Sequence, residues 1–238
     1  MIEVKNLTKK LGGNLILDDL SFTVGRGEIL GFLGPNGAGK STTMKIITTF
    51  WAATSGQVIL DGVDVSANPL AARKKIGYLP ETVPLYEEMK VSEYLKFIAE
   101  IRGLQKNEIK SRIKEAVETC GLVKVVRRPV EELSKGYRQR LGLAQAIIHR
   151  PDILILDEPT TGLDPNQIVE IRDLIKTIGR EKTVIFSTHI LSEVGVTCDR
   201  VIIINQGKIV RQGAPAELER AHGSLEQAFR EVTKENYV

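Results

Sequence analysis

Short apolar runs alternate with longer amphipathic stretches along much of the chain, and each pattern predicts a different element. Nearly continuous apolar runs predict strands buried on both faces, beginning with Glu28–Leu33, which runs into a glycine-rich loop. Apolar residues at helical spacing then predict a helix from about Lys40 to Phe50. Further strands are predicted at Val58–Leu60, Ile153–Leu156, Thr183–Phe186 and Val201–Ile204. Strands mixed with amphipathic helices indicate an α/β domain.

The pattern changes between about Pro84 and Leu133, where no strand-like run occurs and helical spacing dominates. One helix is indicated by Val91, Leu95, Ile98 and Ile101 before Gly103, and a second, after Asn107, by Ile109, Ile113, Ala116, Val117 and Cys120 before Gly121. The sequence therefore predicts a helical insertion of about 50 residues within the α/β domain. The tail from Pro215 onward is expected to form two short helices.

Composition sets limits on the function without naming one. The chain has 238 residues, of which 42% are hydrophobic and 26% charged, as is typical of a globular protein. Its net charge of +3 is too small to indicate binding to nucleic acid or to an anionic membrane. The longest apolar runs have the length of strands, so a role at a membrane would need spanning helices from another chain. The charged N-terminus and the two cysteines, which lack metal-binding spacing, fit a reducing cytoplasm.

Candidate chemistry begins with the segment GPNGAGKS, which matches G-x-x-x-x-G-K-[ST] between a predicted strand and a predicted helix. Its residues are Gly34, Pro35, Asn36, Gly37, Ala38, Gly39, Lys40 and Ser41, with Thr42 following. Small residues let backbone N–H groups turn inward around an anion, and the helix directs its positive dipole end at the same phosphates. Lys40 would reach the β- and γ-phosphates, and the Ser41 hydroxyl would ligate Mg²⁺. A glycine-rich turn with an unrelated lysine is the alternative, and the strand–loop–helix context disfavours it.

The run DILILDEPT predicts a buried strand that ends in two acids. Asp157, at the strand end, is suited to hold the hydration shell of Mg²⁺ beside Ser41. Glu158 follows directly and could polarise a water that attacks the γ-phosphate. Standing alone, the motif would be read as a solvated acidic turn, but beside a phosphate loop it predicts the second half of a nucleotide site.

Three further segments narrow the class of protein. ELSKGYRQRL puts Ser134 and Gly136 at a predicted helix N-terminus, which is a second anion-binding arrangement. TTGLDP follows the two acids, and STH, ending at His189, closes a later strand. This order of motifs resembles the ATPase cassette of ATP-binding cassette (ABC) transporters over essentially the whole chain. By this resemblance Walker A is Gly34–Thr42, the signature is Leu133–Tyr137 and Walker B is Ile153–Asp157.

The resemblance implies a single domain over residues 1–238 with a P-loop NTPase fold of the α/β class. Its central sheet would be mostly parallel, with an N-terminal antiparallel β part, an inserted helical subdomain at about 84–145 and a short helical tail at 215–238. ATP and Mg²⁺ are the implied cofactors. Glu158 would be the catalytic glutamate, Asp164 the acid of the D-loop and His189 the switch histidine.

In this family two cassettes associate head to tail with two ATP molecules between them, each held by Walker A of one copy and the signature of the other. The resemblance therefore implies a homodimer in which Ser134 and Gly136 serve the partner's γ-phosphate. A separate integral-membrane transporter subunit is the second expected partner, and nucleic acid is not expected. The expected location is cytoplasmic, peripheral on the inner face of the cell membrane.

The sequence departs from the family pattern at three places. The signature reads LSKGY instead of the common LSGGQ, so Lys135 adds a cation near the phosphates, which is electrostatically favourable. Glu81 stands where the family usually has a glutamine that touches Mg²⁺ and the attacking water, and its carboxylate can still ligate magnesium. Leu11 stands where an aromatic residue usually stacks on adenine, so only apolar contact is expected there.

The segments Leu85–Leu104 and Leu225–Thr233 resemble exporter-type members of the family, with generic amphipathic helices as the alternative. By this resemblance the loop around Glu81–Tyr86 would dock the membrane subunit through an exposed apolar cluster of Val83, Leu85 and Tyr86. The competing function is a soluble ABC-type ATPase that acts on nucleic acid or ribosomes, but the long coiled coil or second cassette of such proteins is missing. A P-loop kinase or GTPase would not explain LSKGY or His189.

Overall fold

A computed structural model describes residues 1–233 of the chain. Its central sheet is formed by short apolar runs of the sequence. Its strands are β3 (Ile29–Leu33), β6 (Ile76–Leu79), β7 (Ile153–Asp157), β8 (Thr183–Thr188), β9 (Arg200–Asn205) and β10 (Lys208–Gly213). They lie in the order β10-β9-β3-β8-β7-β6, with β10 antiparallel to β9 and the other pairs parallel. The carboxyl ends of β3, β7 and β8 therefore meet at one edge of the sheet, where ligand sites of open α/β sheets form.

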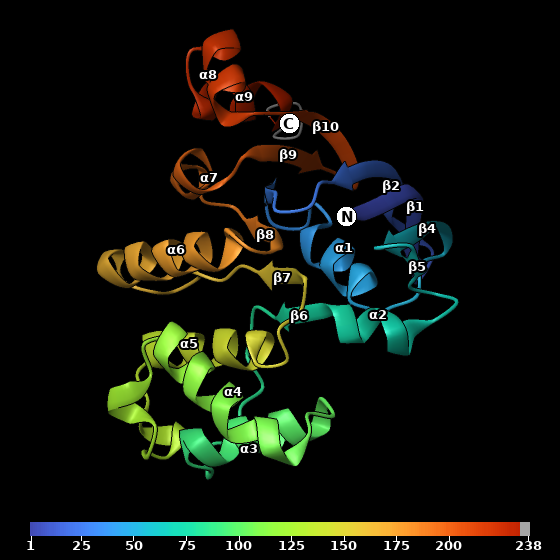
Figure 1. Cartoon of the computed structure of the whole chain (residues 1–238). Coiled ribbons are helices and arrows are strands. Elements are labelled where there is room, and N and C mark those ends of the chain that lie inside the picture. Colours follow the sequence, from blue (N-terminus) through green and yellow to red (C-terminus); the bar gives the residue numbers. More distant parts are fainter. Residues whose placement is uncertain (234–238) are drawn as a thin grey trace.

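A second, antiparallel sheet forms from the N-terminal part of the chain. It contains β1 (Ile2–Leu11), β2 (Asn14–Val24), β4 (Ser55–Leu60) and the short β5 (Val63–Asp64), in the order β2-β1-β4-β5. Gly12 and Gly13, both at positive φ (53° and 86°), form the turn between β1 and β2. Figure 1 shows this antiparallel sheet beside α1 (Lys40–Ile47).

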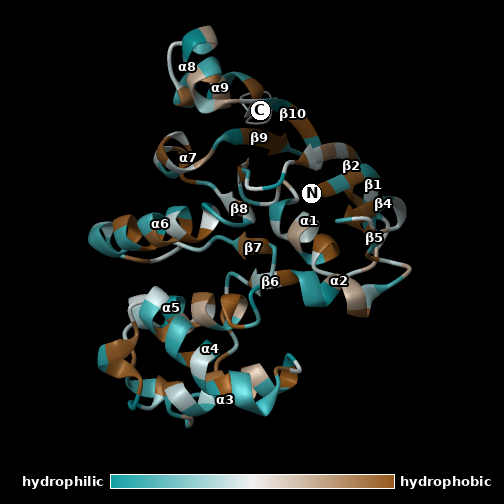
Figure 2. Ribbon diagram, in the orientation of Figure 1, coloured by the Kyte–Doolittle hydropathy of each residue, from teal (hydrophilic) through white to brown (hydrophobic). Residues whose placement is uncertain are grey.

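Buried strand residues separate two faces of the central sheet. On β7, Leu154 and Leu156 pack with the helical region, whereas Ile153 and Ile155 pack toward the N-terminal sheet and α1 (Lys40–Ile47). This alternation follows from the two-residue period of a strand, and all of β7 is buried. Strands β7 and β9 accordingly appear as apolar segments inside the molecule in Figure 2.

Other helices begin at residues suited to cap them. Asn68 accepts a hydrogen bond from the N–H of Ala71 (3.1 Å) at the start of α2 (Pro69–Lys75). Asp164 caps α6 (Pro165–Gly179) in the same way, with proline again as the first helical residue. The remaining helices beside the sheet are α7 (Leu191–Thr197), α8 (Pro215–His222) and α9 (Leu225–Thr233). The predicted tail 215–238 extends beyond α9 into residues 234–238, which lie outside the described residues.

The middle of the chain forms a helical lobe below β6 in Figure 1. It contains α3 (Val91–Ile101), α4 (Lys106–Thr119) and α5 (Lys135–Ile147), with 3-10 turns at Val123–Val125 and Val130–Glu132. Their apolar faces pack around Tyr94, Leu95 and Leu141. Because α5 also contacts β6, the lobe is anchored to the sheet beside the strand ends.

Three details differ from the predictions made from the pattern. The helix after the phosphate loop ends at Ile47 instead of Phe50, because Thr49 has a left-handed φ of 63°. The second helix of the lobe begins at Lys106 instead of after Asn107. Val83 and Leu85 are half-buried against the core of the lobe, and of the three residues only Tyr86 is exposed. The prediction of an exposed apolar cluster formed by these three residues was therefore wrong. No helix within residues 1–233 combines the length and the apolar character needed to cross a membrane.

Candidate active site

The glycine-rich loop leads from β3 into α1, and at two of its positions there is no room for a side chain. Gly39, which caps α1, has a φ of 107°, and a Cβ there would lie 2.6 Å from Cδ2 of Leu17. A Cβ at Gly34 would overlap the carbonyl oxygen of Ile204 on β9. The loop thus lies close against two neighbouring strands, and Ser41 and Thr42, at the start of α1, line the same cavity as Lys40.

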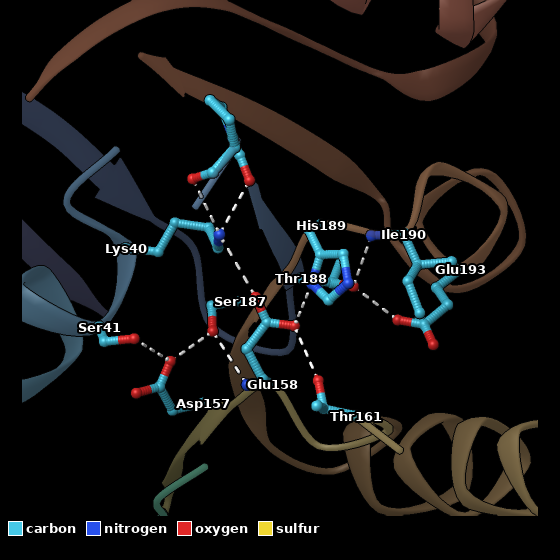
Figure 3. Close-up of polar contacts among 12 residues, drawn as sticks. Lys40, Ser41, Asp157, Glu158, Thr161, Ser187, Thr188, His189, Ile190 and Glu193 are labelled. Atoms are coloured by element: carbon cyan, nitrogen blue, oxygen red, sulfur yellow. Dashed lines mark hydrogen bonds and ion pairs between the residues drawn. The ribbon is translucent and has the colours of Figure 1, made fainter. Parts of the chain in front are cut away.

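Lys40 folds back over the loop from the first turn of α1. Its side chain is only 6% exposed, and Nζ donates to the carbonyl oxygens of Gly34 (2.8 Å) and Pro35 (3.3 Å). The same ammonium lies 3.3 Å from Oε1 of Glu158. A positive charge is therefore held at the centre of the loop, between backbone oxygens and a carboxylate (Figure 3).

Asp157 ends β7 as a buried carboxylate with two hydroxyl donors. Oδ1 accepts hydrogen bonds from Ser187 Oγ (2.6 Å) and Ser41 Oγ (3.0 Å). Burial raises the pKa of Asp157, and the two hydroxyl hydrogen bonds partly offset this effect. The pairing of Asp157 with Ser187 in the β7–β8 register explains why these groups meet.

The carboxylate of Glu158 lies between Lys40 and His189. The backbone of Glu158 adopts a left-handed φ of 50°, and its N–H donates to Oγ of Ser187 (3.0 Å). Oε2 accepts a hydrogen bond from Thr161 Oγ1 (3.2 Å) and lies 2.9 Å from Nδ1 of His189. The strained turn after β7 therefore directs the second carboxylate toward the loop (Figure 3).

A cavity of about 510 Å³ connects these groups. Among the residues predicted from the sequence, it is lined by Leu11, Asn36, Gly37, Gly39, Lys40, Ser41, Thr42, Glu81, Glu158 and His189. Leu11 lies at its rim with 37% of its surface exposed, and Ile16 lines the cavity with it. Backbone donors, a cation, carboxylates and a small apolar rim fit a phosphorylated molecule with a flat apolar end.

Gly34, Pro35 and Ala38 belong to the loop and Asp157 contacts Ser41, although none of these four residues lines the cavity. The remaining predicted residues lie elsewhere. Ser134 caps α5 by accepting from the N–H of Tyr137 (3.4 Å), and both Ser134 and Gly136 line a separate cavity of about 470 Å³. Asp164 accepts from the N–H of Gln167 (3.0 Å) as the cap of α6. Within one copy of residues 1–233, these three residues do not line the cavity that holds Lys40.

Sequence reasoning missed several residues of this site. Ser187 and Thr161 lie inside the segments STH and TTGLDP but were given no role. Gln139, on α5, donates from Nε2 to the carbonyl oxygen of Pro159 (2.6 Å) and ties the start of α5 to the turn after β7. The sequence signal for Thr161 is a hydroxyl three positions after Glu158, and that for Ser187 is a hydroxyl two positions before His189, whereas Gln139 is recognisable only in three dimensions.

A phosphate loop that opens a helix, beside a strand that ends in a buried carboxylate, defines a P-loop nucleoside triphosphatase. The family model described as ABC transporter matches residues 17–161, and the chain belongs to that family. It is an ATP-binding and ATP-hydrolysing subunit of the ABC type, and a soluble ATPase acting on nucleic acid or ribosomes is not favoured.

Three similar proteins illustrate this assignment. The uncharacterized ABC transporter ATP-binding protein YhcH of Bacillus subtilis (strain 168) is 44% identical over 88% of this chain and 68% of its own length. The probable multidrug ABC transporter ATP-binding protein YbhF of Escherichia coli (strain K12) is 38% identical over 96% of this chain, which spans only 41% of YbhF. The dimeric post-hydrolysis structure of the ATP-binding cassette MJ0796 bound to ADP and Pi has a TM-score of 0.80 and 26% identity, covering 90% and 98% of the two chains.

Proposed function

We propose that this chain powers a separate membrane subunit of an exporter through ATP-driven closure of a head-to-tail homodimer. The observation that carries the proposal is the separation of Ser134 and Gly136 from the cavity that contains Lys40 and Glu158. Two separate and incomplete halves of a nucleotide site suit a site that is completed by a second copy of the chain. Closure on ATP can then move an attached subunit.

We assign the roles within one half-site from its contacts. Lys40 binds the β- and γ-phosphates with an ammonium that is already directed into the loop by the Gly34 carbonyl (2.8 Å). Glu158 orients and polarises the attacking water, and His189, 2.9 Å from its Oε2, holds that carboxylate in place. Asn36, Gly37 and Gly39, which line the cavity, surround the phosphates with backbone N–H groups, and Asp164 supports the interface with the second copy.

Magnesium fits the oxygen donors beside the loop. Ser41 Oγ lies 3.0 Å from Oδ1 of Asp157, and Glu81 lines the same cavity. Among residues 1–233 no three acidic, histidine or cysteine side chains form a metal-binding group, which suits an ion held partly by phosphates and water. When bound, the ion neutralises negative charge on the phosphates.

Dimer closure is tested with Glu158→Gln, which removes the general base and leaves the phosphate loop intact. We expect this variant to elute as a dimer with saturating ATP and as a monomer without it, measured by light scattering at micromolar protein. The matched control adds Ser134→Glu, whose negative charge would repel the partner's γ-phosphate and keep the protein monomeric. A Glu158→Gln variant that stays monomeric with ATP would count heavily against the proposal.

The membrane subunit is proposed to dock on the helical lobe of about residues 84–145. A cavity of about 910 Å³ lies between α2, β6 and α3, and its apolar lining includes Leu70, Ile98 and Ile101. Leu70 and Ile101 are 69% and 64% exposed. Tyr86 is 52% exposed and packs edge-on against Phe97 of α3 at 5.3 Å between ring centroids, so it extends the same apolar surface.

Docking is tested by co-purification in gentle detergent with the membrane protein that binds the chain. We expect Tyr86→Glu and Ile101→Glu to abolish co-purification while basal ATPase activity persists. Val210→Glu, on β10 and 38% exposed, is the matched control and should co-purify normally. Normal co-purification of both Tyr86→Glu and Ile101→Glu would rule out this surface. A bound membrane protein would also support the proposed position of the chain on the inner face of the membrane.

Two finer features of the proposal concern the cargo and the base. Export is supported by the relation to YbhF, whose name describes a probable multidrug transporter. Leu11 offers adenine only apolar contact, so we expect ATP to be preferred over GTP by less than about tenfold. A competition titration that gives a much larger preference would contradict this role of Leu11.

A further inference from the structure

A buried carboxylate beside the turn that carries His189 has no part in the roles assigned above. Glu193, in the first turn of α7, is only 2% exposed. Its Oε2 accepts a hydrogen bond from Thr188 Oγ1 (2.7 Å), whereas Oε1 has no hydrogen-bond partner in the part of the chain that the structure describes. Burying a carboxylate is costly unless its oxygens are hydrogen-bonded, so Thr188 is the main contact that holds this one in place.

The hydroxyl of Thr188 links the carboxylate of Glu193 to the backbone N–H of Ile190, the residue after His189. Oγ1 of Thr188 accepts a hydrogen bond from the N–H of Ile190 (3.0 Å) while donating to Glu193. An acid at the third position of a helix ordinarily accepts directly from the N–H of the capping residue. Here Ile190 is the capping residue of α7, and a fully buried hydroxyl is interposed (Figure 3).

This link spans the short turn that carries His189. Thr188 ends β8, Ile190 precedes α7, and His189 lies between two residues that are both fixed by the same hydroxyl. The His189 ring reaches Glu158 from this turn, with 2.9 Å between Nδ1 and Oε2. A shift of the turn by about 1 Å would break that hydrogen bond, and misplacements of this size can cost about 100-fold in rate.

We propose that Glu193 is a positioning residue for ATP hydrolysis, which acts through Thr188 to hold His189 against Glu158. The proposal rests on the role of His189 given above. A carboxylate that served only to cap α7 would stabilise the helix without changing turnover in the folded protein. A positioning carboxylate changes turnover through His189 alone, so its effect depends on the presence of that histidine.

The test measures kcat and KM for ATP hydrolysis by the purified full chain with Mg²⁺. We expect Glu193→Ala and Thr188→Val to lower kcat by about 10- to 100-fold and to change KM by less than about twofold. Glu193→Gln and Thr188→Ser keep the acceptor and the hydroxyl, and both should retain at least about half of wild-type kcat. Ser192→Ala, an exposed neighbour on α7, is the control and should match the wild type.

The deciding comparison places Glu193→Ala in a His189→Ala background. We expect no further loss of kcat in the double variant, because residues that act as a unit are not additive. Equal losses in both backgrounds, or a Glu193→Ala variant with more than about half of wild-type kcat, would overturn the positioning role. If Glu193→Ala does not fold, Thr188→Val is compared in the two backgrounds by the same criteria.

The kcat of the single variant His189→Ala tests the role proposed for His189 separately from the role proposed for Glu193. A His189→Ala variant with wild-type kcat would overturn the role of His189, and the positioning inference with it. An impaired His189→Ala beside an unimpaired Glu193→Ala would remove only the inference about Glu193.

Discussion

Ser187→Ala tests the reasoning about the buried acid of the site most directly. The hydroxyl of Ser187 is fully buried and donates to Oδ1 of Asp157 at 2.6 Å. It also accepts the N–H of Glu158 at 3.0 Å, but that N–H has a second acceptor in the carbonyl oxygen of Ser187 at 3.2 Å. The substitution therefore removes a donor from a buried carboxylate and leaves no backbone group without a partner.

The expected cost follows from these contacts. A hydrogen bond to a charged group contributes about 1.5–3 kcal/mol, and Ser41 still donates to the same oxygen, so we expect about 2 kcal/mol. For a chain of this size that lowers Tm by about 4–8 °C. Removing the donor also raises the pKa of Asp157 further above its usual range. The folded variant then binds a proton more readily than the folded wild type, so the loss of stability should shrink as the pH falls.

The assay is urea unfolding of the wild type, Ser187→Ala and the exposed control Ser192→Ala at about pH 7.5 and about pH 4.5. We expect a loss of about 2 kcal/mol for Ser187→Ala near neutral pH and a clearly smaller loss in acid. The control should stay within about 0.5 kcal/mol of the wild type. A loss below about 0.5 kcal/mol at neutral pH, or one that grows as the pH falls, would refute the reasoning.

Three further predictions concern single side chains. Gln139→Leu leaves the carbonyl oxygen of Pro159 without its buried donor and should cost about 1–3 kcal/mol in urea unfolding; a change below about 0.5 kcal/mol would contradict this. Leu11→Tyr adds an aromatic ring at the cavity rim and should tighten ATP binding by about 2- to 12-fold in a titration. Tripolyphosphate, which has no base, should bind both proteins equally, and equal tightening for it would refute stacking. Burial, with the nearby charge of Arg102, lowers the pKa of His149 from 6.5 to about 4. As the pH is lowered from 6.5 to about 4, the unfolded chain binds a proton that the folded chain does not, so the free energy of unfolding should decrease over this range. Unfolding of His149→Asn over the same pH range should lack this component, and an unchanged pH dependence would exclude His149 as its source.

The sequence by itself determined the features that depend on neighbouring residues. Glycine at Gly37 and Gly39 permits the left-handed backbone of the phosphate loop, with φ of 80° and 107°, and a lysine follows directly. The buried run of β7 and the helix start at Ser134 are also local signals, and the structure has both. For the same reason the pattern identified β3, β7, β8 and β9 of the central sheet but did not predict the edge strand β10. It also misplaced the ends of α1 and α4, since helix ends depend on weaker local signals.

Only the tertiary structure decided which of these features share a cavity. Ser187 meets Asp157 because β7 and β8 are parallel in one particular register, and a shift by one residue would turn the hydroxyl to the other face. His189 reaches Glu158 across 31 positions of sequence, through a turn fixed by the buried Glu193. Strand order and register are set by the packing of whole apolar faces, which no short segment encodes alone. The sequence thus determined that this chain carries a phosphate loop, and the packing of its sheet determined which side chains surround it.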